Sequence, residues 1–253
     1  MKRIHPEQNK GIDQIAAKEK EKRFIESVEF FLSDIGPDQS SDLLLVYSGK
    51  RRATAISLRR FEITYEVGGL ELESEERQAE LYRQLVKQAL DGEEAEKIEK
   101  VVQRIELSGM SVCLADPDIT IQDGRCFYRP QVIIAKDKET MIQLRDAWNR
   151  QEKSRDNEIL IGLLLGYPRT AVEAFASVSG KTFEEQERVL MDSKEILDEY
   201  YDDNTMAFGR IRYSRTHWKE ELQQVREWKN EIKRMSPKIY KAVVDDFHDE
   251  REV

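Results

Sequence analysis

Cysteine and histidine are scarce: the chain of 253 residues contains two cysteines and three histidines. The cysteines, Cys113 and Cys126, lack the CxxC spacing of a zinc site, and the sequence contains neither an HExxH nor a GxSxG motif. These absences leave no sequence pattern for a structural zinc site, a zinc protease or a serine nucleophile at a strand-to-helix turn. We therefore expect no metal site and no cofactor.

Long apolar runs are also missing. The longest, Ile159–Gly166, has eight residues, whereas a membrane span needs about 20, and the N-terminal residues lack the apolar region of a secretory signal. We therefore expect a cytoplasmic protein with no membrane partner. Disulfides are rare in that compartment, so we expect Cys113 and Cys126 to be reduced, although a hairpin between their segments could bring them together.

Charge, by contrast, is abundant. Charged residues make up 36% of the chain, and 41 basic against 50 acidic residues give a formal net charge of −9. This acidity argues against a general polyanion binder, because it repels phosphate backbones.

Basic residues nevertheless gather in two places, Lys50–Arg52 with Arg59–Arg60, and Arg210–Lys219. The second set is interleaved with aromatic residues, as in grooves that bind single-stranded nucleic acid. The candidate contacts for nucleic acid are Arg51, Arg52, Arg210, Arg212 and Arg215. The alternative interpretation is that these arginines pair with the abundant surface acids.

The N-terminal half mixes helical and extended patterns. Residues 1–22 carry many charges and few large apolar side chains, which predicts a mobile arm or a frayed helical lead-in. Apolar residues at helical spacing from Phe24 to Leu32 predict a helix that Gly36-Pro37 ends. Residues 42–47, 53–58 and 61–67 have the composition of strands, and together they predict an antiparallel meander.

Two helices and further strands follow. The predicted helices cover residues 81–90 and 98–105, and the predicted strands cover residues 111–115, 119–121 and 127–135. Pro130 indicates that the last strand begins at an edge or after a bend, because proline cannot donate a hydrogen bond to a neighbouring strand.

From Asp137 onward the pattern is helical. Six apolar residues on one stripe predict a long helix that buries them in the core or at a dimer contact: Trp218, Leu222, Val225, Trp228, Ile232 and Met235. The run Ser179–Thr182 ends like a phosphate-binding loop but lacks that loop's first glycine, so we interpret it as a helix end before a new helix. Thr182 and Glu185 are spaced as a capping box for that helix.

These patterns predict an α+β protein, with an antiparallel or mixed sheet in the N-terminal half and a helical C-terminal half. The expected parts are a flexible charged arm at 1–22, an α+β domain at 23–136 and a helical domain at 137–253. A single continuous domain is the alternative to the last two.

The corner Gly166-Tyr167-Pro168 joins two predicted helices, and Arg169 and Thr170 follow it. Free backbone N–H groups at the start of a helix favour an anion, so Tyr167, Arg169 and Thr170 are candidate ligand-binding residues. The alternative is a structural corner with Tyr167 packed beneath it and Arg169 exposed or paired with Glu173.

The segment around this corner resembles a prokaryotic domain-of-unknown-function family that is marked by Leu-Gly-Tyr-Pro, any residue, two cysteines, an aliphatic residue and a phenylalanine. Leu165 to Pro168, Val172 and Phe175 match that pattern, whereas Thr170 and Ala171 stand in place of the cysteine pair. The resemblance covers about 45 residues, from near Val132 to Phe175. It implies no activity, and the missing cysteines remove any thiol or metal role.

Three functions remain open. The leading hypothesis is a binding or scaffold protein, or one that self-associates as a homo-oligomer. The second is a protein that binds a small anionic ligand, or an enzyme, with a cleft near Gly166–Thr170. The third is a nucleic-acid-binding protein that uses the arginine clusters. The sequence does not decide whether the protein is an enzyme.

Overall fold

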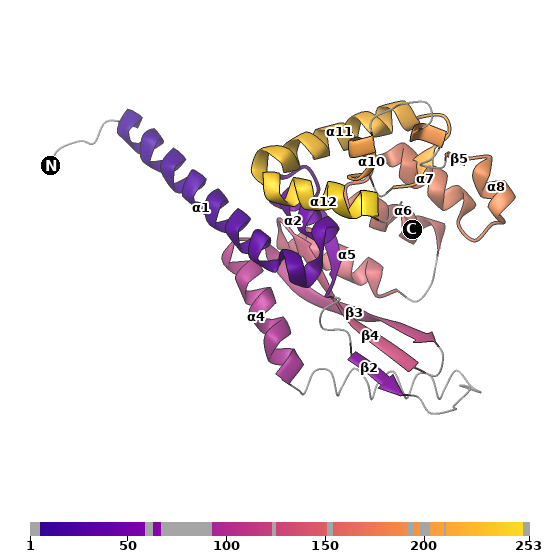
Figure 1. The fold of residues 1–253 in the computed structure, drawn as a ribbon, viewed down its shortest axis with the longest axis horizontal. Helices are drawn as coiled ribbons and strands as arrows, with labels where there is room; N and C mark the ends of the chain where they lie inside the picture. The colour runs from indigo at the N-terminus through magenta and orange to yellow at the C-terminus, as the bar shows by residue number, and fades with distance from the viewer. Residues whose placement is uncertain are drawn as a thin grey trace.

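The protein is α+β, as its sequence predicts, with an antiparallel sheet in the N-terminal half and helices in the C-terminal half (Figure 1). The computed structural model describes residues 6–58, 63–66, 93–122, 125–150, 154–191, 195–197, 203–209 and 211–249. Among these residues, no helix has both the length and the apolar character needed to cross a membrane.

The elements of the N-terminal half are α1 (Pro6–Ile35), α2 (Pro37–Ser48), β1 (Ala53–Ser57), β2 (Ile63–Glu66), α4 (Glu93–Leu107), β3 (Ser111–Gln122) and β4 (Arg125–Ala135). The helices that follow are α5 (Lys138–Trp148), α6 (Arg155–Leu164), α7 (Arg169–Val178), α8 (Phe183–Glu187), α10 (Asp203–Met206), α11 (Trp218–Met235) and α12 (Pro237–Asp249). Two short strands, β5 (Leu190–Met191) and β6 (Tyr213–Ser214), interrupt the predicted all-helical C-terminal half.

Helix α1 projects from the rest of the protein at its N-terminal end (Figure 1). Residues 15–20 are exposed, whereas Phe24, Val28 and Phe31 are buried. The charged arm expected at 1–22 therefore belongs, from Pro6 onward, to the unpacked end of a long helix. Gly36, with φ 84°, follows the last residue of α1, which therefore ends where predicted, and its backbone has a conformation that favours glycine.

The strand predicted at residues 42–47 is wrong, because these residues lie in α2. Leu43, Leu44, Leu45 and Val46 are all at most 1% exposed, since α1, β1, α11 and α12 contact α2 on its different sides. A helix buried all round has no polar face, so its sequence shows a continuous apolar run that periodicity cannot distinguish from a buried strand. Proline at the first helical position is the cue that favours a helix.

The predicted meander is also wrong, because β1 and β2 do not pair with each other. Both pair with β4, β1 through residues 131–135 and β2 through residues 125–128. The other edge of β4 pairs with β3 along its whole length. Thus β4 is central, and β1 and β2 follow one another along one of its edges.

Pro130 lies inside this central strand rather than at a sheet edge. On one side, β3 shifts register between Ala115 and Asp118. On the other side, the paired residues of β1 and β2 leave Pro130 unmatched, and the Pro130 carbonyl accepts from Leu58 N at 3.0 Å. The pairing on both sides of β4 is therefore irregular next to Pro130. Because proline has no N–H group to donate, this irregular pairing allows it to lie in a central strand.

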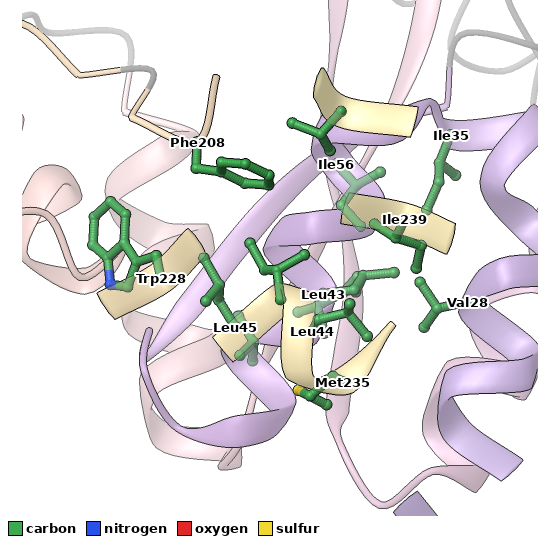
Figure 2. Close-up of a cluster of buried hydrophobic side chains, with 14 of the residues drawn as sticks. Val28, Ile35, Leu43, Leu44, Leu45, Ile56, Phe208, Trp228, Met235 and Ile239 are labelled. Atoms are coloured by element: carbon green, nitrogen blue, oxygen red, sulfur yellow. The ribbon is translucent and has the colours of Figure 1, made fainter. Parts of the chain in front are cut away.

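One hydrophobic core unites the two halves of the chain (Figure 2). Leu43, Leu44 and Leu45 of α2 lie among side chains of α11 and α12, including Trp228, Met235 and Ile239. Residues of both expected parts, 23–136 and 137–253, thus contribute to this core.

The stripe predicted on α11 is buried in this core, with Trp218 7% and Trp228 1% exposed. This confirms the helix and its facing, and it means that the stripe is not an exposed surface for a second copy. Several predicted features lie outside the described residues: the helix at 81–90 and the basic residues Arg59, Arg60 and Arg210.

Candidate functional site

The corner between α6 and α7 is a helix end closed by glycine. Gly166 has φ 80°, its N–H donates to the Leu163 carbonyl at 3.1 Å, and Tyr167 N donates to the Gly162 carbonyl at 3.0 Å. These two bonds form the arrangement that commonly terminates helices at a left-handed glycine. Pro168 then precedes the first turn of α7, which begins at Arg169.

This corner packs against the residues that follow α2. A Cβ at position 166 would lie 3.1 Å from the Cα of Arg51, so the two backbones approach closely at Gly166. Gln224 Nε2 of α11 donates to the Gly166 carbonyl at 3.1 Å. Glycine is therefore needed here for its left-handed backbone and for space.

Arg51 is the centre of this contact. Its guanidinium carbon lies 4.9 Å from the ring centroid of Tyr167 and 4.3 Å from that of Trp228. Its Nη1 donates to Asp42 Oδ1 at 2.6 Å, and Thr54 Oγ1 donates to the other oxygen of that carboxylate at 3.3 Å. A planar cation that can stack on rings and bond a carboxylate in its plane suits this position.

Arg51 is therefore not an exposed contact for nucleic acid, since the residue is 4% exposed. Arg215 is also engaged by the protein: its Nε donates to the Glu187 carbonyl at 2.9 Å, and its Nη2 lies 3.1 Å from a carboxylate oxygen of Glu195. Arg52 and Arg212 are exposed. Of the five arginines predicted to contact nucleic acid, three are exposed within the described part of the chain, and one of these three, Arg215, is paired with Glu195.

Arg169 and Thr170 do not line the groove beside this corner, which Tyr167 lines. Arg169 is exposed and pairs with Glu173, with 3.1 Å between Nη1 and Oε1. Tyr167 turns toward Arg51 and Trp228, with 6.4 Å between the Tyr167 and Trp228 ring centroids. The exposed Arg169–Glu173 pair is the feature expected of a structural corner.

A groove of about 280 Å³ lies beside this corner, between α6, α7 and the residues before β6. It is lined by apolar side chains and two charged ones: Glu158, Ile161, Gly162, Leu165, Tyr167, Ala171, Val172, Phe175, Ile211 and Arg212. Tyr167 is the one residue of the predicted ligand-binding set that lines it. Phe175, on α7, is 42% exposed.

The walls of the groove are held by close packing. A Cβ at Gly162 would lie 2.6 Å from Val172 Cγ2, so α6 and α7 approach closely at this glycine. A Cβ at Gly209 would lie 2.2 Å from the hydroxyl of Tyr213, which fixes the start of the segment that carries Ile211 and Arg212. The groove is thus formed by elements that tertiary contacts already position.

The two charged lining residues differ in their surroundings. Glu158 Oε1 accepts from Ser179 Oγ at 2.6 Å, and Oε2 is withdrawn from solvent with no hydrogen-bond partner in the described structure. Arg212 is exposed. This groove could not be predicted as a whole from the sequence, because its residues come from two separate segments, 158–175 and 211–212, which only tertiary packing brings together.

The two cysteines are far apart in the sheet. Cys113 of β3 is opposite Ile133 of β4, whereas Cys126 is seven residues away along β4. At ~3.4 Å per residue this is roughly 24 Å, well beyond the reach of a disulfide. Burial raises the pKa of the Cys113 thiol, and the nearby Arg145 opposes that shift only in part.

The run Ser179–Thr182 and the Thr182–Glu185 pair have a structural role at the start of α8. Thr182 and Glu185 make the predicted capping box, which confirms that Ser179–Thr182 joins a helix end to a helix start. No group of three histidine, cysteine or acidic side chains that could hold a metal ion occurs among the residues with described positions.

Comparisons of the chain with protein-family models, curated proteins and solved structures find no match. The resemblance of the segment ending at Phe175 to a domain-of-unknown-function family stays a prediction.

Proposed function

We propose that the protein is a binding protein that holds a small, largely apolar ligand in the groove between α6 and α7. The observation that carries this proposal is the lining, in which eight of the ten residues are uncharged and almost all of those are apolar. Small-ligand sites are concave and mainly apolar, with volumes of about 300–1,000 Å³. The groove, at about 280 Å³, is close to the lower end of that range.

Pre-organisation of the groove supports binding. The glycine-terminated helix end, the contact of Gly162 with Val172 and the stacking of Tyr167 on Arg51 all hold the walls without a ligand. A ligand therefore does not have to order these elements, and that cost is not subtracted from its affinity.

The test uses phenylnaphthylamine, a neutral apolar dye whose fluorescence rises when it enters an apolar site. We expect saturable binding that Phe175→Ala weakens by about three- to tenfold, because an aromatic wall contributes about 0.5–1.5 kcal/mol beyond its buried area. Phe175 is partly exposed, so the variant is expected to fold.

Phe183→Ala is the matched control. Phe183, at the start of the neighbouring helix α8, is 70% exposed and does not line the groove. Equal weakening of dye binding by both substitutions, or by neither, would place the dye elsewhere and contradict the proposal.

A further inference from the structure

We propose that the ligand of this groove is a small amphipathic anion, with an apolar body in the groove and a carboxylate or a similar head group at Arg212. This inference rests on the proposed function and adds the charge of the ligand. It is carried by the contrast between the two charged residues that line the groove.

Arg212 is available to a ligand. Its side chain is exposed, lines the groove and forms no ion pair with any residue of the described ranges. Three other exposed arginines in the same half of the protein are already paired: Arg169 with Glu173, Arg188 with Glu184 and Arg215 with Glu195. Arg155 is exposed and has no ion pair within the described ranges, but it does not line the groove. In a chain with nine more acidic than basic residues, an arginine that lines an apolar groove and has no acidic partner among the described residues leaves a positive charge for an incoming anion.

Glu158 is not available in the same way. One carboxylate oxygen accepts from Ser179, and the other is withdrawn from solvent. A cationic head group would therefore find only Oε1, which already accepts from Ser179. The negative charge of Glu158 disfavours an anion beside it, so the head group belongs at Arg212.

The size of the groove indicates a free small molecule rather than a folded partner. At about 280 Å³ it accommodates a short alkyl chain or a fused ring pair. The anionic head remains near solvent, because Arg212 itself is exposed.

The experiment compares two dyes that share one ring system. Anilinonaphthalene sulfonate is phenylnaphthylamine with an added sulfonate, so the ratio of their dissociation constants measures the contribution of the negative charge. We expect the sulfonate to bind wild-type protein about three- to tenfold more tightly than the neutral dye, and we expect high salt to reduce this advantage.

Arg212→Gln is expected to abolish the advantage of the sulfonate and to leave the affinity for the neutral dye within about twofold. Arg169→Gln, which removes an exposed arginine that does not line the groove, is the matched control and should change neither affinity. Glu158→Gln should leave sulfonate binding unchanged or strengthen it.

Competition against the neutral dye extends the test to simple ligands. Octanoate should displace it at lower concentration than octylamine, and Arg212→Gln should remove that preference. A stronger displacement by octylamine, or a sulfonate advantage that survives Arg212→Gln, would overturn the anion assignment.

Failure of the two proposals can be told apart. If Phe175→Ala does not weaken binding of the neutral dye, the groove is not the binding site and the proposed function fails. If that substitution weakens binding of the neutral dye but the sulfonate gains nothing, only the inference about charge fails.

Discussion

Replacing Arg51 with alanine tests whether this buried cation joins the α6–α7 corner to the core. The substitution removes a guanidinium that lies over the rings of Tyr167 and Trp228 and is bonded to Asp42 at 2.6 Å. It leaves the Asp42 carboxylate with Thr54 as its remaining side-chain partner in the described structure. We expect the free energy of unfolding to fall substantially.

The magnitude follows from these contacts. Removing one partner of a fully buried ion pair costs about 3–5 kcal/mol, but the side chain of Asp42 is 27% exposed and regains some hydration. Each desolvated cation–π contact adds about 0.5–2 kcal/mol, and the contributions overlap. An overall loss of about 3 kcal/mol is expected, which lowers Tm by about 6–12 °C in a protein of this size.

The assay is thermal unfolding followed by far-ultraviolet circular dichroism. Arg51→Lys keeps the charge but loses the planar group that stacks, so its Tm should lie between those of Arg51→Ala and wild type. Arg52→Ala, at the exposed neighbouring position, should change stability by less than about 0.5 kcal/mol. If Arg51→Ala and Arg52→Ala have the same Tm, the corner does not depend on Arg51 and the reasoning is refuted.

Two further predictions concern backbone and capping groups. Gly166→Ala should lower the free energy of unfolding by more than about 1 kcal/mol in urea titrations, because the residue has φ 80° and its Cβ would approach the Arg51 Cα to 3.1 Å; an unchanged unfolding midpoint would contradict this. Hydrogen bonds from Thr140 to the side chain of Asp137 at the start of α5 lower the pKa of that carboxyl in the folded protein. Its contribution is therefore complete above the pKa of the unfolded chain and is lost as the pH falls through the lower, folded pKa. Asp137→Ala should lower the free energy of unfolding by about 0.5–2 kcal/mol at neutral pH and by less at pH ~3. Asp137→Asn, whose side chain can still cap the helix, should lower the free energy of unfolding only slightly at neutral pH. If Asp137→Ala has the same effect at both pH values, the negative charge of Asp137 does not contribute to stability.

Local signals in the sequence predicted most of the helices. The stripe from Trp218 to Met235 and the capping box at Thr182 depend on residues three or four positions apart, and the structure confirms both. The same local information failed for α2. Its four consecutive buried residues reflect neighbours on every side, which a sequence window does not contain.

Sheet pairing was harder to predict because it is long-range. In the pairing of β1 with β4, Ala53 lies opposite Ala135, which is 82 positions away in the sequence. The strand that follows β1 in the sequence, β2, pairs instead with a different part of β4. Sequential strands pair or neighbour one another only about two-thirds of the time, so the assumption of a meander had no support in the residues themselves.

The arginines show why the candidate site was only partly predictable. Composition alone grouped Arg51 with Arg52 and Arg212, yet one is buried between two rings and the others are exposed. The residues that bury Arg51 are Asp42, Tyr167 and Trp228, which come from three distant parts of the chain. Whether a basic residue in such a cluster is buried or exposed thus depends on tertiary contacts, which its neighbours in the sequence do not indicate.

The segment that resembles the domain-of-unknown-function family divides its residues between two tasks. Gly166 closes a helix, and Tyr167 contacts the Arg51 stack with its ring and also lines the groove. Val172 packs against Gly162, and Phe175 borders the groove. Of the two positions where that family's pattern has cysteines, Ala171 lines the groove and Thr170 does not. Ala171 gives the groove an apolar wall without a thiol, which suits the proposed binding of a ligand by apolar contact and by the charge of Arg212.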